Sequence, residues 1–491
     1  MKWVLYNLLF AAVYPFLLPG FLMRMLKRGG YAARMGDRFA LYPSSLNLNL
    51  QPSASYVWIH AVSVGEVQVA GQLMREWRKA DPSVRFCFST TSSTGWKIAE
   101  KELAALQPQP PTSTSDILIY NPLDFPNFVK SALKTVRPRA IVLTESEIWP
   151  NFILQAKKTG IPLFLINARV SDRSAPRYKF ARYFFKDVFG AFTKIFAQSD
   201  LDASRIRAAM GWRGKDSAAP VVGDASDAGA KLTGDAESLP LRDNVVVTGS
   251  FKFDVAKRNE AKEKELREWI FGKEESKSKV EVEDPKAKIL LGGSTWPGED
   301  KVLLDIYQSI LRLRLSTSTL LVLAPRHFEK AEEVEANIKA AGFTCIRRSR
   351  GESFHSQTST STSNLPTSQP VYLCDTTGEM MGLFGICDVA FVGKSLCAHG
   401  SQNMIEPCLC GKPTFVGPYT ENFRPVMSDL LASDAIVQVK DAEELKSRIV
   451  ELFSRDGDAA LGERAKAAVL NRRGVVPRCV QAIREELRSE V

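Results

Sequence analysis

The feature that most limits the fold of this chain is an alternation of short apolar runs with helical stretches, which occurs in two successive sets. Strands that alternate with helices pair as parallel β-α-β units, so the pattern predicts an α/β fold with doubly wound sheets. The first set of predicted strands is Tyr56–Ala61, Arg85–Thr90, Ala140–Leu143, Pro162–Ile166 and Lys194–Ala197. The second set is Ile289–Leu291, Thr319–Ala324, Val371–Leu373, Val389–Val392 and Thr414–Val416.

Two domains are also expected from the length, because 491 residues are too many for one core. We predict two Rossmann-like domains that face a cleft. The boundary is expected in the Gly-, Asp- and Ala-rich region between Trp212 and Asn244, which gives domains over residues 31–235 and 236–491. The helical segment Ala459–Val491 is expected to close over the body. Three polar or charged surface inserts without chemistry are predicted: Gln107–Asp116, Lys273–Lys288 and Gln357–Gln369.

The N-terminus is almost uninterruptedly apolar from Trp3 to Leu26, which is long enough to span a bilayer as a helix. Pro15 and Pro19 would bend such a helix, which membrane helices tolerate. A basic collar of the cytoplasmic kind consists of Arg24, Lys27, Arg28, Arg34 and Arg38. We therefore predict an uncleaved membrane anchor over residues 1–30 and a body on the cytoplasmic face. A signal peptide is the rival interpretation, but no A-x-A cleavage pattern follows.

The net charge of +10 and the pI near 9.1 indicate an anionic partner, either a membrane or a phosphorylated substrate. Nucleic acid is not expected, because no basic stripe is interleaved with aromatic residues. Among the eight cysteines only Cys408 and Cys410 are close, and the four histidines are scattered. This distribution indicates reduced thiols and predicts neither a zinc site nor a cofactor.

Two acidic clusters follow predicted strands of the first set, where ligands bind in open α/β sheets. Glu66 stands at the start of a helix, where it either satisfies the positive helix end or acts as a general base. Glu145 and Glu147 follow the strand Ala140–Leu143. This carboxylate pair is a candidate for a divalent metal site or for orienting basic groups.

A basic run follows the strand Pro162–Ile166 and contains Arg169, Arg173 and Arg177. Such a run can be a solvated helix face. Its place at a strand end favours an anion site, because guanidinium groups match phosphate and carboxylate oxygens.

The second half contains glycine-rich turns that open helices, where backbone N–H groups can bind phosphate. These segments are Gly249–Asp254, Gly292–Thr295, Pro325–His327, Asp375–Met380 and Gly400–Pro407. An acid such as Glu406 can accept hydrogen bonds from ribose hydroxyls. In this order the segments predict a nucleotide pocket, with the stretch from Asp375 to Pro418 at its centre.

Seven of these segments resemble the 3-deoxy-D-manno-octulosonic acid (Kdo) transferases of Gram-negative lipopolysaccharide synthesis. They are His60–Glu66, Thr144–Asn151, Asn167–Ser174, Thr248–Asp254, Ala324–His327, Asp375–Leu396 and Gln402–Pro407. The resemblance implies a GT-B fold and an inverting, metal-independent transfer of Kdo from CMP-Kdo to a lipid A precursor, lipid IVA. It also implies a location at the cytoplasmic face of the inner membrane, with membrane lipids as partners.

The resemblance further implies roles for individual residues. Glu66 matches the general base, and Glu145 and Lys252 match residues that stabilise the transition state. The residues that match CMP-contacting positions are Pro325, Arg326, Thr377, Gly378, Glu379, Asn403, Met404, Ile405 and Glu406. No metal ligand is implied.

The chain departs from the family pattern at Gln402, where the family usually has histidine, and at Lys394, where it usually has glycine. Two other functions stay open on the sequence. One is another membrane GT-B glycosyltransferase that uses a UDP-sugar. A sugar-nucleotide 2-epimerase shares this fold, but such an enzyme is soluble, so the predicted anchor counts against it. The other is a non-catalytic, membrane-bound protein that binds lipid A or CMP.

Overall fold

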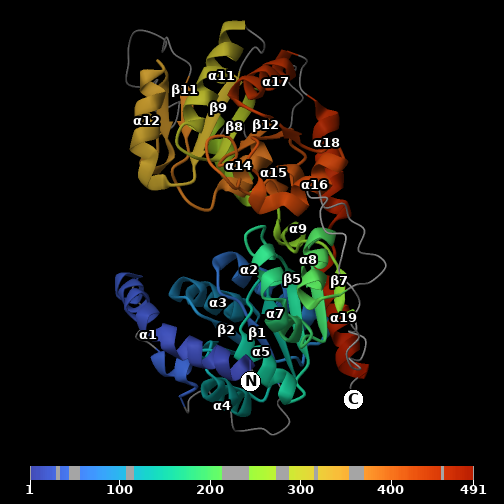
Figure 1. The fold of residues 1–491 in the computed structure, drawn as a ribbon. Helices are drawn as coiled ribbons and strands as arrows, with labels where there is room; N and C mark the ends of the chain where they lie inside the picture. Colours follow the sequence, from blue (N-terminus) through green and yellow to red (C-terminus); the bar gives the residue numbers. More distant parts are fainter. Residues whose placement is uncertain are drawn as a thin grey trace. The chain divides into compact units, whose positions relative to one another are not determined.

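The computed structural model describes residues 2–28, 34–43, 56–106, 116–212, 243–272, 287–313, 319–352, 370–454 and 458–489. The chain forms two compact units, shown in Figure 1. Unit 1 contains residues 1–255 and 474–491, and unit 2 contains residues 256–473.

Unit 1 is built on a parallel sheet with the strand order β3-β2-β1-β4-β5-β6-β7. Its strands are β1 (Val57–His60), β2 (Phe86–Thr90), β3 (Ile117–Tyr120), β4 (Ala140–Thr144), β5 (Leu163–Ala168), β6 (Lys194–Ala197) and β7 (Val245–Val247). Its helices are α1 (Lys2–Arg28), α2 (Val64–Ala80), α3 (Ser93–Leu106), α4 (Pro126–Val136), α5 (Pro150–Lys158), α6 (Ala175–Phe180), α7 (Arg182–Phe189), α8 (Asp200–Met210), α9 (Lys252–Val255) and α19 (Val475–Ser489).

Helices cover both faces of this sheet. Apolar residues of α4, α5, α7 and α8 pack on one face, and those of α2, α3 and α19 pack on the other. Because both faces are buried, the central strands are continuously apolar rather than alternating: β4 reads AIVLT and is buried throughout.

Unit 2 repeats this plan with the strand order β10-β11-β9-β8-β12-β13-β14, again parallel. Its strands are β8 (Lys288–Thr295), β9 (Thr319–Pro325), β10 (Thr344–Arg347), β11 (Pro370–Leu373), β12 (Val389–Val392), β13 (Thr414–Val416) and β14 (Val437–Gln438). Its helices are α10 (Glu260–Phe271), α11 (Glu299–Leu313), α12 (Ala331–Ala340), α14 (Met380–Ile386), α15 (Ile405–Leu409), α16 (Arg424–Ala432), α17 (Ala442–Ser454) and α18 (Ala459–Asn471). Residues of α11, α12 and α17 cover one face, and those of α10 and α14 cover the other.

All ten predicted strands are confirmed, and four further strands were not predicted: β3, β7, β10 and β14. The predicted surface inserts lie almost wholly outside the described residues. Three residues at their ends are described, Asp116, Ala287 and Lys288. Asp116 accepts hydrogen bonds from Arg78 Nη2 at 2.8 and 2.9 Å, and Lys288 begins β8.

The structure divides the chain later than the predicted boundary at residues 235 and 236. The reason is that β7 pairs with β6 and therefore completes the sheet of unit 1. The C-terminal segment is helical as predicted, but it is shared between the units: α18 belongs to unit 2 and α19 to unit 1. Asp254 fixes α19 to unit 1 by accepting hydrogen bonds from Gly474 N and Val476 N, each at 2.7 Å.

The predicted anchor is helical, as α1, but the described residues contain no helix that is both long and apolar enough to cross a membrane. The proposed collar also needs correction at two of its five cations. Arg38 is only 3% exposed and lies 4.4 Å over the Tyr120 ring, and Arg34 pairs with Asp37 at 2.9 Å. These two cations therefore hold the short helix Met35–Phe39 in place instead of facing a lipid surface.

Candidate active site

In unit 1, the order of the strands brings two acidic loops together. The chain runs outward from β1 in one direction through β2 and β3 and in the other from β4 to β7. The crevice beyond the carboxyl ends of β1 and β4 is therefore the switch point, where open α/β sheets bind ligands. Glu66 follows β1, and Glu145 and Glu147 follow β4, so all three carboxylates belong to this crevice.

Glu66 is held by the start of α2. Ser63 is the N-cap residue, and its Oγ accepts a bond from Glu66 N at 3.3 Å and donates to Glu66 Oε1 at 2.8 Å. Glu66 Oε2 accepts bonds from Val62 N at 3.0 Å and from Thr144 Oγ1 at 3.1 Å. The helix begins at Val64, two residues before its predicted start, so Gly65 lies inside its first turn.

Glu66 thus contributes to the cap at the start of α2. This contribution does not exclude the other role, because Oε1 uses only one of its lone pairs on Ser63. The side chain is 8% exposed, and its bonds come from both switch-point strands, which fixes its orientation. A carboxylate fixed in this way is suited to accept a proton from a hydroxyl placed against it.

Glu145 occupies a left-handed backbone conformation, with φ of 50°, directly after β4. Burial raises the pKa of its carboxyl, Lys252 opposes this shift, and the charge of Glu66 adds to it. Burial lowers the pKa of Lys252, whereas Glu145 raises it. The two predicted transition-state residues are therefore electrostatic partners, and Arg169 stands close enough to affect both.

Asn167 connects these groups, although no role was predicted for its side chain. It is fully buried, its Nδ2 donates to Glu145 Oε1 at 3.2 Å, and its Oδ1 accepts a bond from Phe251 N at 3.0 Å. One amide thereby fixes Glu145 and the turn that carries Lys252 relative to each other. Its left-handed φ of 52° at a strand end is a conformation that asparagine tolerates well.

Glu147 lies beside His60, the last residue of β1. Burial raises the pKa of Glu147 to about 7, and the charges of Glu66 and Glu145 add to the effect, while a hydrogen bond from Trp149 Nε1 at 3.0 Å opposes it. His60 Nε2 lies 4.0 Å from Glu147 Oε2. Burial lowers the pKa of His60 to about 4, so this imidazole is neutral at physiological pH.

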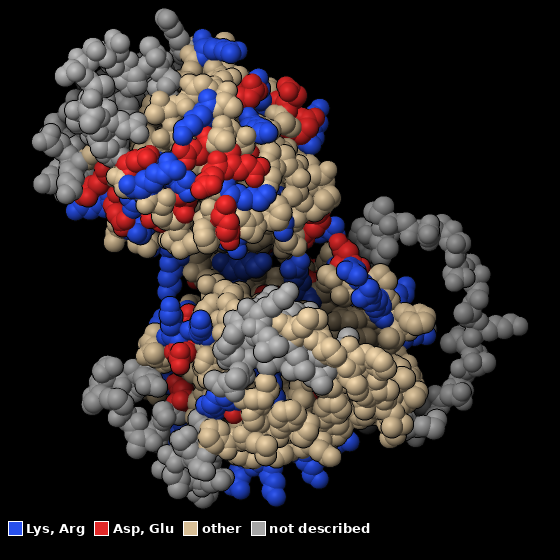
Figure 2. All heavy atoms as spheres, turned by 90° about the vertical axis from the view of Figure 1, so that its left-hand side faces the viewer, with Lys and Arg blue, Asp and Glu red and all other residues tan. Residues whose placement is uncertain are grey.

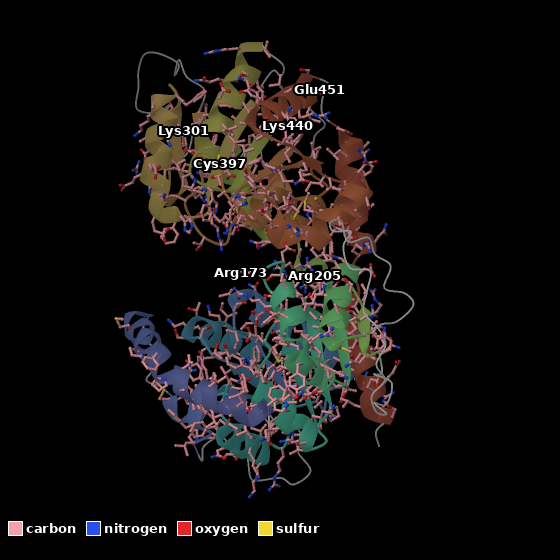
Figure 3. All side chains as sticks on the ribbon, in the orientation of Figure 1. Arg173, Arg205, Lys301, Cys397, Lys440 and Glu451 are labelled. Atoms are coloured by element: carbon pink, nitrogen blue, oxygen red, sulfur yellow. The ribbon has the colours of Figure 1, made fainter. Side chains whose placement is uncertain are left out.

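The three candidate arginines separate. Arg169 lies by the carboxylates. Arg173 is exposed just before α6, and Arg177 is exposed within it. Arg173 lies at the same edge of unit 1 as Arg205, which is also labelled in Figure 3. Arg205 fixes this loop by donating to Val170 O and Asp172 Oδ1, each at 2.6 Å. Within the described ranges, no group of three or more His, Cys, Asp or Glu side chains is arranged to hold a metal ion.

In unit 2 the equivalent switch point lies between β8 and β12. Arg326 is exposed at the end of β9, and its backbone N–H donates to Thr295 O at the end of β8. Burial raises the pKa of Glu406, and a hydrogen bond from Asn403 Nδ2 at 3.0 Å and the charge of Arg326 oppose the shift. The structure therefore brings Arg326, Asn403 and Glu406 together.

The remaining predicted nucleotide contacts differ in what they can offer. Thr377 and Gly378 are exposed in the turn after β11, where Gly378 has φ of 83°. Glu379 is buried, and its carboxylate already binds Cys374 Sγ at 3.0 Å and Arg348 at 3.4 Å. The side chains of Met404 and Ile405 are fully buried, so only their backbone could meet a ligand.

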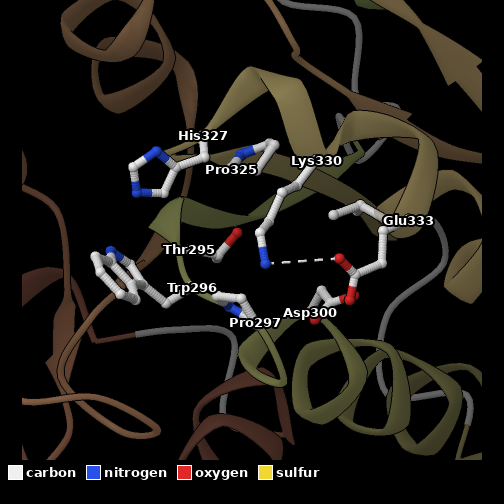
Figure 4. A pocket seen from close by; sticks show the side chains of 9 residues that line it. Thr295, Trp296, Pro297, Asp300, Pro325, His327, Lys330 and Glu333 are labelled. Carbon is white, nitrogen blue, oxygen red and sulfur yellow. Dashed lines mark ion pairs between the residues drawn. The ribbon is translucent and has the colours of Figure 1, made fainter.

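A pocket opens beside Pro325 at the carboxyl ends of β8 and β9. It is lined by Thr295, Trp296, Pro297, Asp300, Pro325, His327, Lys330, Glu333 and Val334. The rings of Trp296 and His327 meet at one side, with their centroids 5.4 Å apart, and Lys330 pairs with Glu333 at 3.7 Å at the other (Figure 4). The sequence indicated only the Gly292–Thr295 and Pro325–His327 parts of this wall.

A buried carboxylate, Glu299, connects the two switch-point loops of unit 2 and was also missed. It is fully buried at the start of α11 and accepts hydrogen bonds from Trp296 N at 2.7 Å and Lys394 N at 2.9 Å. Its other oxygen accepts bonds from Ser395 N and Leu396 N at 3.1 and 3.0 Å. The sequence signal was an acid in the first turn of a helix, which is common and therefore uninformative alone.

Comparison with known proteins gives consistent results over most of the chain. Residues 33–222 match a protein family described as 3-deoxy-D-manno-octulosonic-acid transferase (kdotransferase). The 3-deoxy-D-manno-octulosonic acid transferase of Haemophilus influenzae is 27% identical over 468 residues, which cover 95% of this chain and 94% of that protein. The transferase of the same description from Bordetella pertussis is 28% identical over 439 residues, 89% of this chain and 88% of its own.

The fold is also found in solved structures. The UDP-GlcNAc 2-epimerase of Neisseria meningitidis, bound to UDP-GlcNAc, superposes with a TM-score of 0.51 over 88% of this chain and 100% of that one, at 13% identity. This likeness concerns the fold alone. It agrees with the GT-B-like arrangement of two parallel α/β sheets, which transferases and epimerases share.

Proposed function

We propose that this chain, which belongs to the Kdo transferase family, transfers Kdo from CMP-Kdo to a lipid A precursor in lipopolysaccharide synthesis. The observation that carries the proposal is the meeting of Glu66, Glu145 and Lys252 around the switch point of unit 1. Glu66 and Glu145 come from loops after different strands, and Lys252 acts electrostatically on Glu145.

In the proposed reaction, Glu66 is the general base. An acceptor hydroxyl gives its proton to the Glu66 carboxylate while its oxygen attacks the anomeric carbon of Kdo. The bond from that carbon to the phosphate oxygen breaks, and CMP leaves with the bonding electrons, so the configuration inverts. Ser63, Val62 and Thr144 fix the carboxylate, which removes the need to orient it during the reaction.

Glu145 and Lys252 are proposed to stabilise the transition state. Positive charge develops on the sugar ring and negative charge on the departing phosphate, so a fixed anion and a fixed cation can each stabilise one centre. Asn167 supports this role by fixing the loops that carry both residues. Arg169 is proposed to bind an anionic group of the acceptor, and exposed Arg173 and Arg177 are proposed to bind its outer phosphate.

Unit 2 is proposed to bind the CMP part of the donor. Exposed Arg326 suits the phosphate, and the turn at Thr377 and Gly378 presents backbone N–H groups. Asn403 and Glu406, which are bonded to each other, suit the ribose hydroxyls. Backbone groups of Pro325, Glu379, Met404 and Ile405 complete the proposed CMP site. No metal is proposed, because the protein's own cations can compensate the phosphate charge.

Association with the inner membrane is proposed to involve α1. One side of this helix is bound to unit 1: Lys2 pairs with Asp187 at 2.6 Å, and the ring of Phe10 lies 5.1 Å from that of Phe125. The other side exposes large apolar residues at helical spacing, namely Val4, Leu5, Leu8, Leu9, Val13 and Phe16. Figure 2 shows a broad area of unit 1 without acidic or basic side chains. Such a face is typical of helices that lie in a lipid interface.

The test of the proposed function is incubation of the full-length protein with CMP-Kdo and tetra-acylated lipid A precursor, followed by mass spectrometry of the lipid. We expect a product that is heavier by Kdo, at a rate that excess chelator does not change. A preparation that binds CMP but forms no product would support a non-catalytic binding protein instead. Transfer from a UDP-sugar but not from CMP-Kdo would contradict the proposed donor.

A further inference from the structure

Lys394 lies in the loop that follows β12, at the switch point of unit 2. β8 pairs with β12 on one side and with β9 on the other, so the loops after all three strands emerge at one edge of the sheet. Trp296 follows β8, His327 follows β9 and Lys394 follows β12. Such an edge is where open α/β sheets bind ligands.

The backbone of Lys394 is held in an unusual conformation. Its φ is 59°, in the left-handed region that glycine occupies readily and that a residue with a Cβ occupies at a cost. The loop cannot relax easily, because Glu299 accepts hydrogen bonds from the backbone N–H groups of Lys394, Ser395 and Leu396. A lysine in a strained conformation at a ligand-binding edge of the sheet suggests a function for its side chain.

The side chain of Lys394 is directed onto an aromatic surface. Its Nζ lies 4.9 Å from the centroid of the Trp296 ring, and the Trp296 ring in turn meets that of His327. Across the part of the chain that the structure describes, no carboxylate forms an ion pair with Lys394. An ammonium group that rests on a ring keeps its positive charge uncompensated, so it can attract an anion.

We propose that Lys394 binds an anionic group of the sugar-nucleotide donor and helps to select that donor, with Trp296 as the surface that positions its ammonium group. This inference rests on the proposed function. CMP-Kdo offers two groups of suitable chemistry, the phosphate and the carboxylate of the sugar, and an ammonium group binds either of them. Lys394 follows β12, whereas Arg326 follows β9, so the contact proposed for Lys394 adds to the one proposed for Arg326.

The test compares Lys394→Gly with Lys394→Arg and with Arg137→Gly. Arg137 is a matched control because it is an exposed cation with φ of 49°, at the end of α4 in unit 1. Both glycine variants remove a positive charge and relieve a left-handed backbone, so both are expected to keep or raise resistance to urea. Lys394→Gly alone is expected to raise the KM for CMP-Kdo, by about tenfold, and to weaken its dependence on salt. Lys394→Arg should retain most of the affinity.

The affinity for CMP alone, measured by calorimetry, distinguishes the two anionic groups. If Lys394 binds the phosphate, Lys394→Gly weakens the binding of CMP and of CMP-Kdo to a similar degree. If it binds the carboxylate, only CMP-Kdo is affected. A stable Lys394→Gly variant with wild-type KM and wild-type CMP affinity would overturn the inference while leaving the proposed function intact. A wild-type protein that transfers nothing from CMP-Kdo would overturn the proposed function itself.

Discussion

The two units have closely similar sheets but different ionisable groups at their switch points. In unit 1 the loops after β1 and β4 bring together Glu66, Glu145 and Glu147, and the pKa values of the last two are raised by burial. In unit 2 the loop after β12 presents Lys394, and Glu299, which follows β8, is fully buried and bound to backbone N–H groups. We therefore propose that the same topology serves proton-accepting chemistry in one unit and anion binding in the other.

The largest effect should come from removing the base of unit 1 without removing its structural role. Glu66→Gln keeps an oxygen that can accept hydrogen bonds but loses the ability to take a proton, so we expect kcat to fall by about 10³-fold. Measurement of transfer under saturating donor and acceptor checks this. CMP affinity, measured by calorimetry, should be unchanged.

Ser63→Ala is the matched control for the capping role of Glu66. It removes the N-cap hydroxyl and should cost about 1 kcal/mol of unfolding free energy while activity largely persists. If Ser63→Ala lost as much activity as Glu66→Gln, the orientation of the Glu66 carboxylate by Ser63 would be as important to transfer as its ability to take a proton.

A smaller effect is expected from unit 2. Arg326→Ala removes an exposed cation at the end of β9 and should weaken CMP binding by about 10- to 100-fold, the range for a hydrogen bond to a charged group. Calorimetric titration with CMP measures this directly. Turnover at saturating donor should stay near the wild-type value, and a variant with unchanged CMP affinity would show that the phosphate is bound elsewhere.

The smallest effect concerns stability and its dependence on pH. The pKa of Glu147 is raised from 4.5 to about 7, so the folded state holds this proton more tightly than the unfolded state. The Glu147 carboxyl therefore lowers the free energy of unfolding once the group ionises in the unfolded state. This loss of stability grows as pH rises from about 4.5 to 7. Glu147→Gln should therefore raise the unfolding free energy at pH 8 by about 1–3 kcal/mol and change it little near pH 4.

Urea titrations at several pH values give the difference between wild-type and Glu147→Gln protein. Glu100→Gln serves as a control, because Glu100 is exposed in the middle of α3. A difference for Glu147→Gln that does not vary with pH would show that this carboxyl has the same pKa in the folded and unfolded protein.

The sequence allowed the sheets to be predicted well because buried parallel strands are continuously apolar. The strands that were missed are short or adjoin polar inserts: β7 has three residues with two of them exposed, and β3 follows Gln107–Asp116. The boundary was misplaced because pairing of β7 with β6 is a long-range contact that no local composition reports.

The candidate site was predicted only at the level of motifs. Glu66, Glu145, Lys252 and Arg326 were identified as candidates, but the amide of Asn167 and the carboxylate of Glu299 were not. Both residues act by bonding to segments far away in the chain, and their neighbours in sequence give no sign of this. The collar residue Arg38 was misread for the same reason, since its partner is Tyr120.

The most direct test of this division between the units is a variant with Glu66, Glu145 and Glu147 all changed to Gln, with both CMP binding and Kdo transfer measured. We predict that CMP binds with an affinity within about threefold of wild type, less than 1 kcal/mol, while transfer to the lipid A precursor is no longer detected. Loss of CMP binding, or transfer at a rate close to wild type, would contradict the assignment of chemistry to unit 1 and donor binding to unit 2.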